Sequence, residues 1–217
     1  MESNKLFIWS LRRSGAHGII EWLKPLYGNK LKLFNNSKTD SPKGMSGEED
    51  PAVIGLEDKV PKKLKEGKHL AIIRNPYNLI ASRFKMWELT PTYMYVDTLD
   101  EQLALDVDLW KRFLKSSIKN TDKHKAFRIV VFDNWFQSKD YRKDIASWLG
   151  VEFTTDDGIN NVNNTYGSSF DEHDYDGKAQ DMQVLNRYKS IECKKLFEPL
   201  FEDKELKSLY YKLSKEF

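Results

Sequence analysis

Two short segments of the sequence combine residue types that bind phosphate groups. The first is Arg12-Arg13-Ser14-Gly15, which follows the apolar segment 5–10. If a helix begins after this segment, its first backbone N–H groups can hold an anion. Gly15 would let the backbone approach that anion closely, while Ser14 adds a hydroxyl group and Arg13 a fixed charge. The alternative is an ordinary helix start with two solvated arginines, because short motifs give many false positives.

The second segment is Arg74-Asn75-Pro76, which follows the apolar residues 70–73, with Ser82 eight positions after Arg74. Pro76 suits the first turn of a helix. An arginine at the end of a strand and a serine two turns into the next helix could hold one phosphate group from two sides. The plainer interpretation makes Arg74 a surface ion pair and Ser82 an ordinary helix residue. Only the combination of the two segments is specific.

The elements that must position these segments alternate along the chain. The apolar runs predict strands at 5–10, 31–34, 53–56, 70–73 and 127–132. The periodicity predicts helices from about 19 to 27, 77–87, 100–118 and 141–149, and two more between 182 and 217 separated near Pro199. This order predicts one α/β domain, residues 1–217, with a mainly parallel central sheet flanked by helices. Ligands of such sheets bind beyond the carboxyl ends of the strands, where both segments would lie.

Composition excludes several classes of protein. Of 217 residues, 40% are hydrophobic and 31% charged, as in globular proteins. A net charge of +2 argues against nucleic acid as the main partner. A single cysteine, Cys193, excludes an internal disulfide framework and fits a reducing compartment. No apolar run approaches the roughly 20 residues of a membrane span, so we expect a soluble, cytoplasmic protein.

Taken together, the two segments resemble the donor motifs of the sulfotransferase superfamily that uses PAPS (3′-phosphoadenosine 5′-phosphosulfate). Its members share a 5′-phosphosulfate loop after the first strand, often a basic residue followed by Ser-Gly-Thr. They also share a 3′-phosphate motif, Arg-Asn-Pro with a serine eight residues beyond the arginine. Residues 13–15 match the former, and residues 74–76 with Ser82 match the latter. The resemblance implies a P-loop-like sulfotransferase fold, PAPS as donor, PAP (its desulfonated product) as product, and no required metal.

The resemblance extends less specifically over most of the chain. Residues 130–135 and 145–150 look like the family's late strand and the helix after it. Residues 166–170 lie where the family has a loop over the 3′-phosphate end of the donor. The resulting candidates for donor binding are Arg12, Arg13, Ser14, Gly15, Ala16, His17, Arg74, Ser82, Ser168 and Ser169.

The sequence departs from the family pattern directly after the first glycine. The family's Thr-Thr-Trp is Ala16-His17-Gly18 here. Ala16 lacks a hydroxyl donor, and Gly18 lacks an aromatic ring that could stack on adenine. Trp22, one helical turn further on, could compensate, but we expect it to be a core residue.

Sulfuryl transfer is an in-line displacement in which charge develops on the leaving phosphate oxygen. We assign the stabilisation of this charge to Arg13 and the backbone N–H groups near it, with His17 as a further candidate. The acceptor, a hydroxyl or an amine, needs a general base. Relatives use a His or Glu after the middle strand, which makes Glu57 the candidate and His17 the second choice. Glu57 could equally be an ordinary acidic residue at a turn.

Other functions remain open from the sequence. A P-loop-like kinase is one, since residues 130–133 resemble a strand with an Mg²⁺-binding aspartate, but no Walker Lys-Ser/Thr pair is present. A non-catalytic PAP-binding module is another. The aromatic segment 84–95 either lines an acceptor cleft or packs a helix. The basic runs 62–65 and 111–112 either attract an acidic acceptor or form solvated faces. The sequence identifies neither the acceptor nor an oligomeric state.

Overall fold

The computed structural model describes residues 5–28, 31–34, 52–89, 91–161, 175, 177–189 and 194–217. Five strands form one sheet in the order β2-β3-β1-β4-β5, and each neighbouring pair is parallel. The strands are β1 (Lys5–Ser10), β2 (Lys32–Phe34), β3 (Ala52–Glu57), β4 (Lys68–Ile73) and β5 (Phe127–Val131). The predicted parallel sheet is confirmed. Its central strands are almost wholly apolar because both faces of the sheet are covered.

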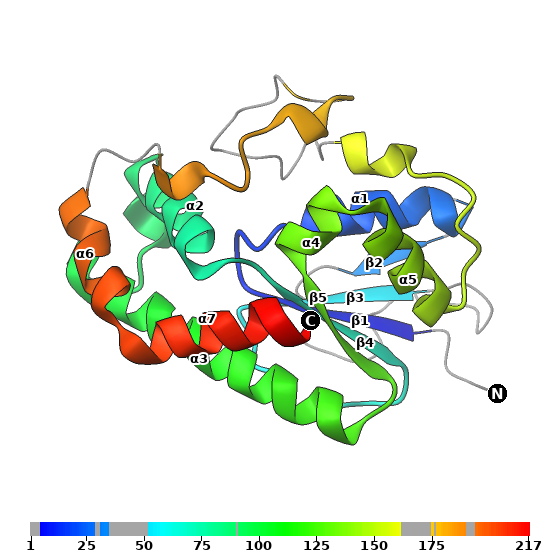
Figure 1. The fold of residues 1–217 in the computed structure, drawn as a ribbon, viewed down its shortest axis with the longest axis horizontal. Coiled ribbons are helices and arrows are strands. Elements are labelled where there is room, and N and C mark those ends of the chain that lie inside the picture. Colours follow the sequence, from blue (N-terminus) through cyan, green and yellow to red (C-terminus); the bar gives the residue numbers. More distant parts are fainter. Residues whose placement is uncertain are drawn as a thin grey trace.

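Helices cover both faces of this sheet. The helices are α1 (Ala16–Leu26), α2 (Pro76–Leu89), α3 (Leu99–Lys123), α4 (Phe132–Gln137), α5 (Lys139–Leu149), α6 (Lys194–Glu202) and α7 (Lys204–Glu216). Short 3₁₀ turns lie at Pro91–Tyr93 (η1), Asp157–Asn160 (η2), Ala179–Asp181 (η3) and Arg187–Lys189 (η4). Figure 1 shows α1 and α5 on one side of the sheet and α3 and α7 on the other. None of the described helices is long and apolar enough to cross a membrane.

Alternation along β1 divides the core into two layers. Leu6 and Ile8 point into the layer under α1 and α5, whereas Phe7 and Trp9 point into the layer under α3 and α7. This period of two places successive side chains on opposite faces of a strand. The same alternation continues to the carboxyl ends of the strands, so that neighbouring residues there face different helices.

Two details of the predicted secondary structure are wrong. Strand β5 ends at Val131, and Phe132 already begins α4, a short helix that the apolar pattern did not reveal. Near the C-terminus, the first described helix begins at Lys194, not near 182, and it continues through Pro199. The break comes instead at Asp203, whose carboxylate accepts a hydrogen bond from Leu206 N at 2.9 Å and so starts α7.

Candidate active site

The loop between β1 and α1 makes a tight turn that ends in glycine. Ser14 N donates to Leu11 O at 2.9 Å, and both Arg13 (φ 71°) and Gly15 (φ 91°) adopt the left-handed conformation. A Cβ atom at Gly15 would lie 2.1 Å from the ring of Phe132, so only glycine fits. Gly15 starts α1 without a side-chain cap from the described residues. The first turn of α1 therefore presents backbone N–H groups in the manner of an anion site.

The hydroxyl of Ser14 is the loop's most direct indication of a ligand. Ser14 is buried, and its Oγ has no hydrogen-bond partner among the described residues. A buried hydroxyl without a partner costs stability, unless a ligand supplies the missing hydrogen bond. The loop therefore fits an anionic group.

Arg74, at the end of β4, is buried and reaches back to this loop. Its guanidinium donates to Arg13 O at 3.1 Å and to Val184 O, and it lies over the Phe132 ring at 5.1 Å. Trp110 of α3 donates to the carbonyl oxygen of Arg74 at 3.0 Å. Arg74 is thus not the surface ion pair of the alternative interpretation.

Ser82, fully buried on α2, lies between two further arginines. Its Oγ accepts hydrogen bonds from Arg13 Nε and from Arg187, both at 3.3 Å. The structure therefore brings Arg13, Arg74 and Ser82 together, although the sequence separates the two motifs by about sixty residues. We missed Arg187, which lies in the turn η4 within a stretch predicted as helix. No local motif marks it.

Asn78 of α2 positions the segment that carries Arg187. Its Nδ2 donates to Leu185 O at 2.7 Å, and its Oδ1 accepts from Tyr188 N at 3.5 Å. The side chain is buried, so both interactions are shielded from water. One polar residue thereby ties residues 184–188 to the helix that holds Ser82.

Asn75 explains why the second motif contains asparagine before proline. Its Oδ1 accepts from Tyr77 N at 2.9 Å and from Asn78 N at 3.2 Å, which caps α2. Its side-chain amide donates to Tyr210 Oη at 2.7 Å, and its backbone N–H donates to Asp133 at 3.0 Å. Asp133, the residue that suggested a kinase-like Mg²⁺ ligand, is thus engaged in fixing the start of α2.

Arg83 forms a second network behind the first loop. It is buried, and it donates to Arg12 O at 3.0 Å, to Asp58 at 2.6 Å and to Asp106. Asp58 also accepts from Arg12 N at 2.8 Å. Burial raises the pKa of Asp106, and the adjacent Arg83 charge opposes that shift. No sequence pattern indicates this network, because its members come from four separate segments of the chain.

Glu57 and His17, the candidate proton acceptors, lie next to this loop. Glu57 ends β3 directly beside Ser10, and its Oε2 lies 3.8 Å from Arg12 Nε. Burial lowers the pKa of His17; the Glu57 carboxylate opposes this shift, and Arg13 reinforces it. The lowered pKa favours the neutral imidazole, which can accept a proton.

Gly18, which stands where the family pattern has tryptophan, lies beside an aromatic ring from another helix. A Cβ at Gly18 would lie 3.7 Å from the Trp135 ring, so an indole from α4 fills the space beside it. Trp22 is fully buried and donates to Asp156 at 3.2 Å, as expected of a core tryptophan. Ala16 is the first residue of α1.

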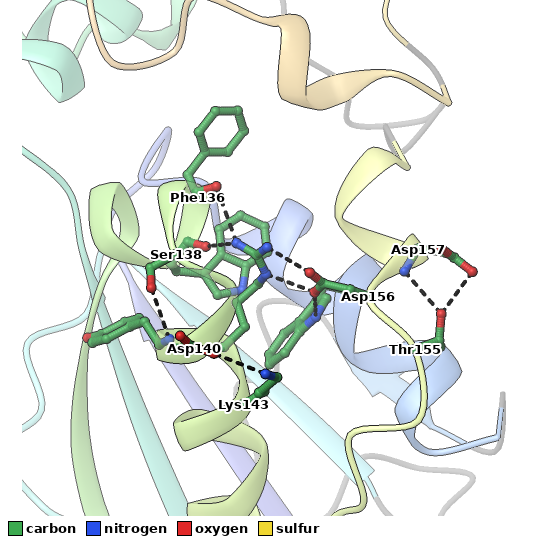
Figure 2. Close-up of polar contacts among 11 residues, drawn as sticks. Phe136, Ser138, Asp140, Lys143, Thr155, Asp156 and Asp157 are labelled. Atoms are coloured by element: carbon green, nitrogen blue, oxygen red, sulfur yellow. Dashed lines mark hydrogen bonds and ion pairs between the residues drawn. The ribbon is translucent and has the colours of Figure 1, made fainter.

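Asp156 fixes α4 and α5 in place, as Figure 2 shows. Arg142 donates to both carboxylate oxygens of Asp156, at 2.8 and 2.7 Å, and to Trp135 O at 2.5 Å. The ring of Phe136 points away from this polar cluster, and it stacks on Phe132 with 5.9 Å between ring centroids. These contacts therefore hold α4, the helix whose Phe132 ring packs against Gly15, in place.

Several further predicted residues have simpler outcomes. Met86 and Trp87 are buried, so this part of the aromatic segment packs α2 onto the core. Ser168 and Ser169, with the loop 166–170, lie outside the described residues. Within the described ranges, no group of three or more His, Cys, Asp or Glu side chains is arranged to hold a metal ion.

No protein-family model and no curated protein matches the sequence. Solved structures match its fold. The sulfotransferase domain of the Synechococcus PCC 7002 olefin synthase has 11% identity and a TM-score of 0.58, over 98% of this chain and 94% of that domain. Mouse sulfotransferase SULT7A1, complexed with PAP, has 16% identity and a TM-score of 0.55 over 73% of this chain. This chain spans 61% of that mouse protein. The predicted sulfotransferase fold is confirmed.

Proposed function

We propose that this chain, which has the fold of the sulfotransferases, transfers a sulfuryl group from PAPS to a hydroxyl or amine acceptor. The observation that carries the proposal is the meeting of the two motifs: Arg13 Nε lies 3.3 Å from Ser82 Oγ, and Arg74 donates to Arg13 O. Two motifs far apart in sequence thus lie together, which supports a single donor site. A similarly folded sulfotransferase, mouse SULT7A1, was solved with PAP, which supports the same class of donor here.

The donor has two anionic ends, and the site has two sets of donors. Arg74, Ser82 and Arg187 would hold the 3′-phosphate, since arginine offers several N–H groups to phosphate oxygens. The β1–α1 loop would hold the 5′-phosphosulfate through its backbone N–H groups and the Ser14 hydroxyl. The buried Ser14 Oγ, which has no partner among the described residues, fits this assignment. We leave Ser168 and Ser169 as proposed contacts of the 3′ end.

The reaction requires charge stabilisation and the removal of one proton. As the acceptor oxygen or nitrogen bonds to sulfur, the bond from sulfur to the 5′-phosphate oxygen breaks, and negative charge develops on that phosphate. Arg13 and the loop N–H groups would stabilise this charge. Glu57 would take the proton of the acceptor, with neutral His17 as the alternative base. Arg12, 3.8 Å from Glu57, helps to orient that carboxylate.

Nucleotide selectivity tests the proposal most simply. We would titrate the protein with PAP, 5′-AMP and ATP by calorimetry, without Mg²⁺, and repeat the ATP titration with Mg²⁺. PAP should bind at least ten-fold more tightly than 5′-AMP, because only PAP carries the 3′-phosphate. A preference for ATP with Mg²⁺ would contradict the proposal and favour a kinase. PAP binding without sulfuryl transfer from labelled PAPS to any acceptor class would indicate a non-catalytic binding module.

A further inference from the structure

Basic side chains also gather outside the proposed donor site. They line an open cavity of about 650 Å³ between the segment after β3 and the middle of α3. Its basic lining residues are Lys59, Lys62, Lys63 and Arg112, and its apolar ones include Trp9 and Leu109. The two basic runs of the sequence, 62–65 and 111–112, thus contribute to one cavity. The proposed donor site uses none of these residues.

The cavity adjoins the loop that would hold the phosphosulfate. Asp58 lines it, and the same carboxylate accepts a hydrogen bond from Arg12 N at 2.8 Å. Trp9 is the penultimate residue of β1, and only Ser10 separates it from that loop. A molecule in this cavity would therefore reach the carboxyl edge of the sheet, which is where an acceptor must meet the donor.

The backbone beside the basic wall of the cavity is held by α3. The carbonyl oxygen of Pro61 accepts hydrogen bonds from Ser116 Oγ at 2.6 Å and from Asn120 Nδ2 at 2.7 Å. Both donors belong to α3, so the backbone next to Lys62 and Lys63 is anchored to that helix. Such anchoring reduces the ordering of the backbone that ligand binding would require.

The charges of the lining are strongly one-sided. Four basic residues face one acid, Asp58, and that acid is already bound by Arg83 at 2.6 Å. Lys62 and Lys63 are exposed. Arg112 pairs with Asp108, but both side chains are more than half exposed, so this pair contributes little stability. A cleft lined by one sign of charge concentrates ligands of the other sign.

The floor of the cavity is apolar. Trp9 uses its indole N–H to donate to His69 at 3.0 Å, so the ring offers only carbon atoms to the cavity. Leu109 extends this surface from α3. An apolar floor under a cationic rim suits a ring that carries a negative charge, and does not suit a neutral polar molecule.

We propose that this cavity binds a carboxylate or sulfate group of the acceptor. The acceptor would then be an anionic ring compound that carries its hydroxyl or amine close to the charged group. The proposal rests on the proposed function only in naming the ligand an acceptor; the cavity's preference for anions is independent of it. An acidic sugar and a hydroxylated aromatic acid share this chemistry, and the test separates them.

The test compares charged probes with neutral counterparts of the same shape. The aromatic pair is 4-hydroxybenzoate and 4-hydroxybenzamide, and the sugar pair is methyl glucuronide and methyl glucoside. Affinities are measured by ligand-detected NMR in the presence of saturating PAP. We expect the charged member of at least one pair to bind ten-fold or more tightly, and the responding pair identifies the source. Equal affinities within both pairs, or no binding, would overturn the proposal.

Two double variants locate the effect. Lys62→Ala/Lys63→Ala should abolish the charge preference without changing the unfolding midpoint, since both side chains are exposed. Lys139→Ala/Lys143→Ala, with the same change of charge on α5, is the control and should keep it. A preference that survives in the first variant would overturn the proposal. PAP titration of the same proteins is independent: failure of the wild type to bind PAP refutes the sulfotransferase, not the anion site.

Discussion

Buried arginines occupy two places near the first loop: Arg83 lies in one, and Arg74 with Arg187 in the other. Arg83 donates to the carboxylates of Asp58 and Asp106. Arg74 donates to two carbonyl oxygens, and Arg187 donates to the hydroxyl of Ser82. The carboxylates tie the guanidinium of Arg83 to the fold, whereas carbonyl and hydroxyl oxygens orient Arg74 toward the first loop and Arg187 toward Ser82. We infer that Arg83 serves the fold, and that Arg74 and Arg187, together with Ser82, serve the ligand.

The largest expected effect comes from the carboxylate-bound group. Arg83→Ala would leave Asp106 buried without its partner, and breaking a buried ion pair costs about 3–5 kcal/mol. Urea unfolding should show this loss of free energy. Arg112→Ala is the matched control, because its exposed pair should be worth no more than about 0.5 kcal/mol. A similarly small loss in both variants would contradict the claim that Arg83 stabilises the fold.

A smaller loss of stability is expected at Gly15, which lies in the loop that Arg74 and Arg83 both contact. Gly15→Ala combines a left-handed φ of 91° with a Cβ 2.1 Å from Phe132, so we expect a loss of about 2–4 kcal/mol from strain and overpacking. Gly28→Ala is the control: its φ is 61°, but nothing lies within 4 Å of the added Cβ, so only about 1 kcal/mol should be lost. Equal losses in thermal or urea unfolding would show that the Phe132 contact does not matter.

The smallest effect is a dependence of stability on pH, which arginines cannot cause because they do not titrate near neutrality. Burial lowers the pKa of His17 and His69 below the ordinary 6.5. Below about pH 6.5 the unfolded chain therefore binds more protons than the folded chain. The free energy of unfolding consequently decreases as the pH is lowered. The slope should not exceed about 1.4 kcal/mol per pH unit for each histidine. Stability that rises on acidification from pH 7 to 5.5 would contradict these assignments.

The sequence predicted the sheet well because its strands are short apolar runs, each followed by a polar turn. The two donor motifs could also be predicted from the sequence, since their spacing and strand context are local properties. Helix α4 could not be predicted, because Phe132 continues the apolar run of β5 into the first helical turn. The end of α6 was misplaced at Pro199, since a capping aspartate, Asp203, decides where the next helix begins.

The rest of the site depends on contacts between distant segments. Ser82 meets Arg187, which is 105 residues away, and Arg83 meets Asp58 and Asp106 from separate elements. No periodicity or spacing encodes such pairs. Likewise, Lys62 and Arg112 belong to separate basic runs, and only the fold places them around one cavity. Local motifs therefore indicated the donor site, while its supporting network and the basic cavity required the structure.

The central claim is that Arg74 and Ser82 hold the donor. Calorimetric titration with PAP tests it directly in wild type, Arg74→Ala and Ser82→Ala, with Arg112→Ala as a surface control. Hydrogen bonds to charged groups contribute about 1.5–3 kcal/mol, so the account predicts that Arg74→Ala weakens PAP binding by about 10- to 150-fold. Ser82→Ala should weaken it less, and Arg112→Ala not at all. Unchanged PAP affinity in folded Arg74→Ala and Ser82→Ala proteins would contradict the account.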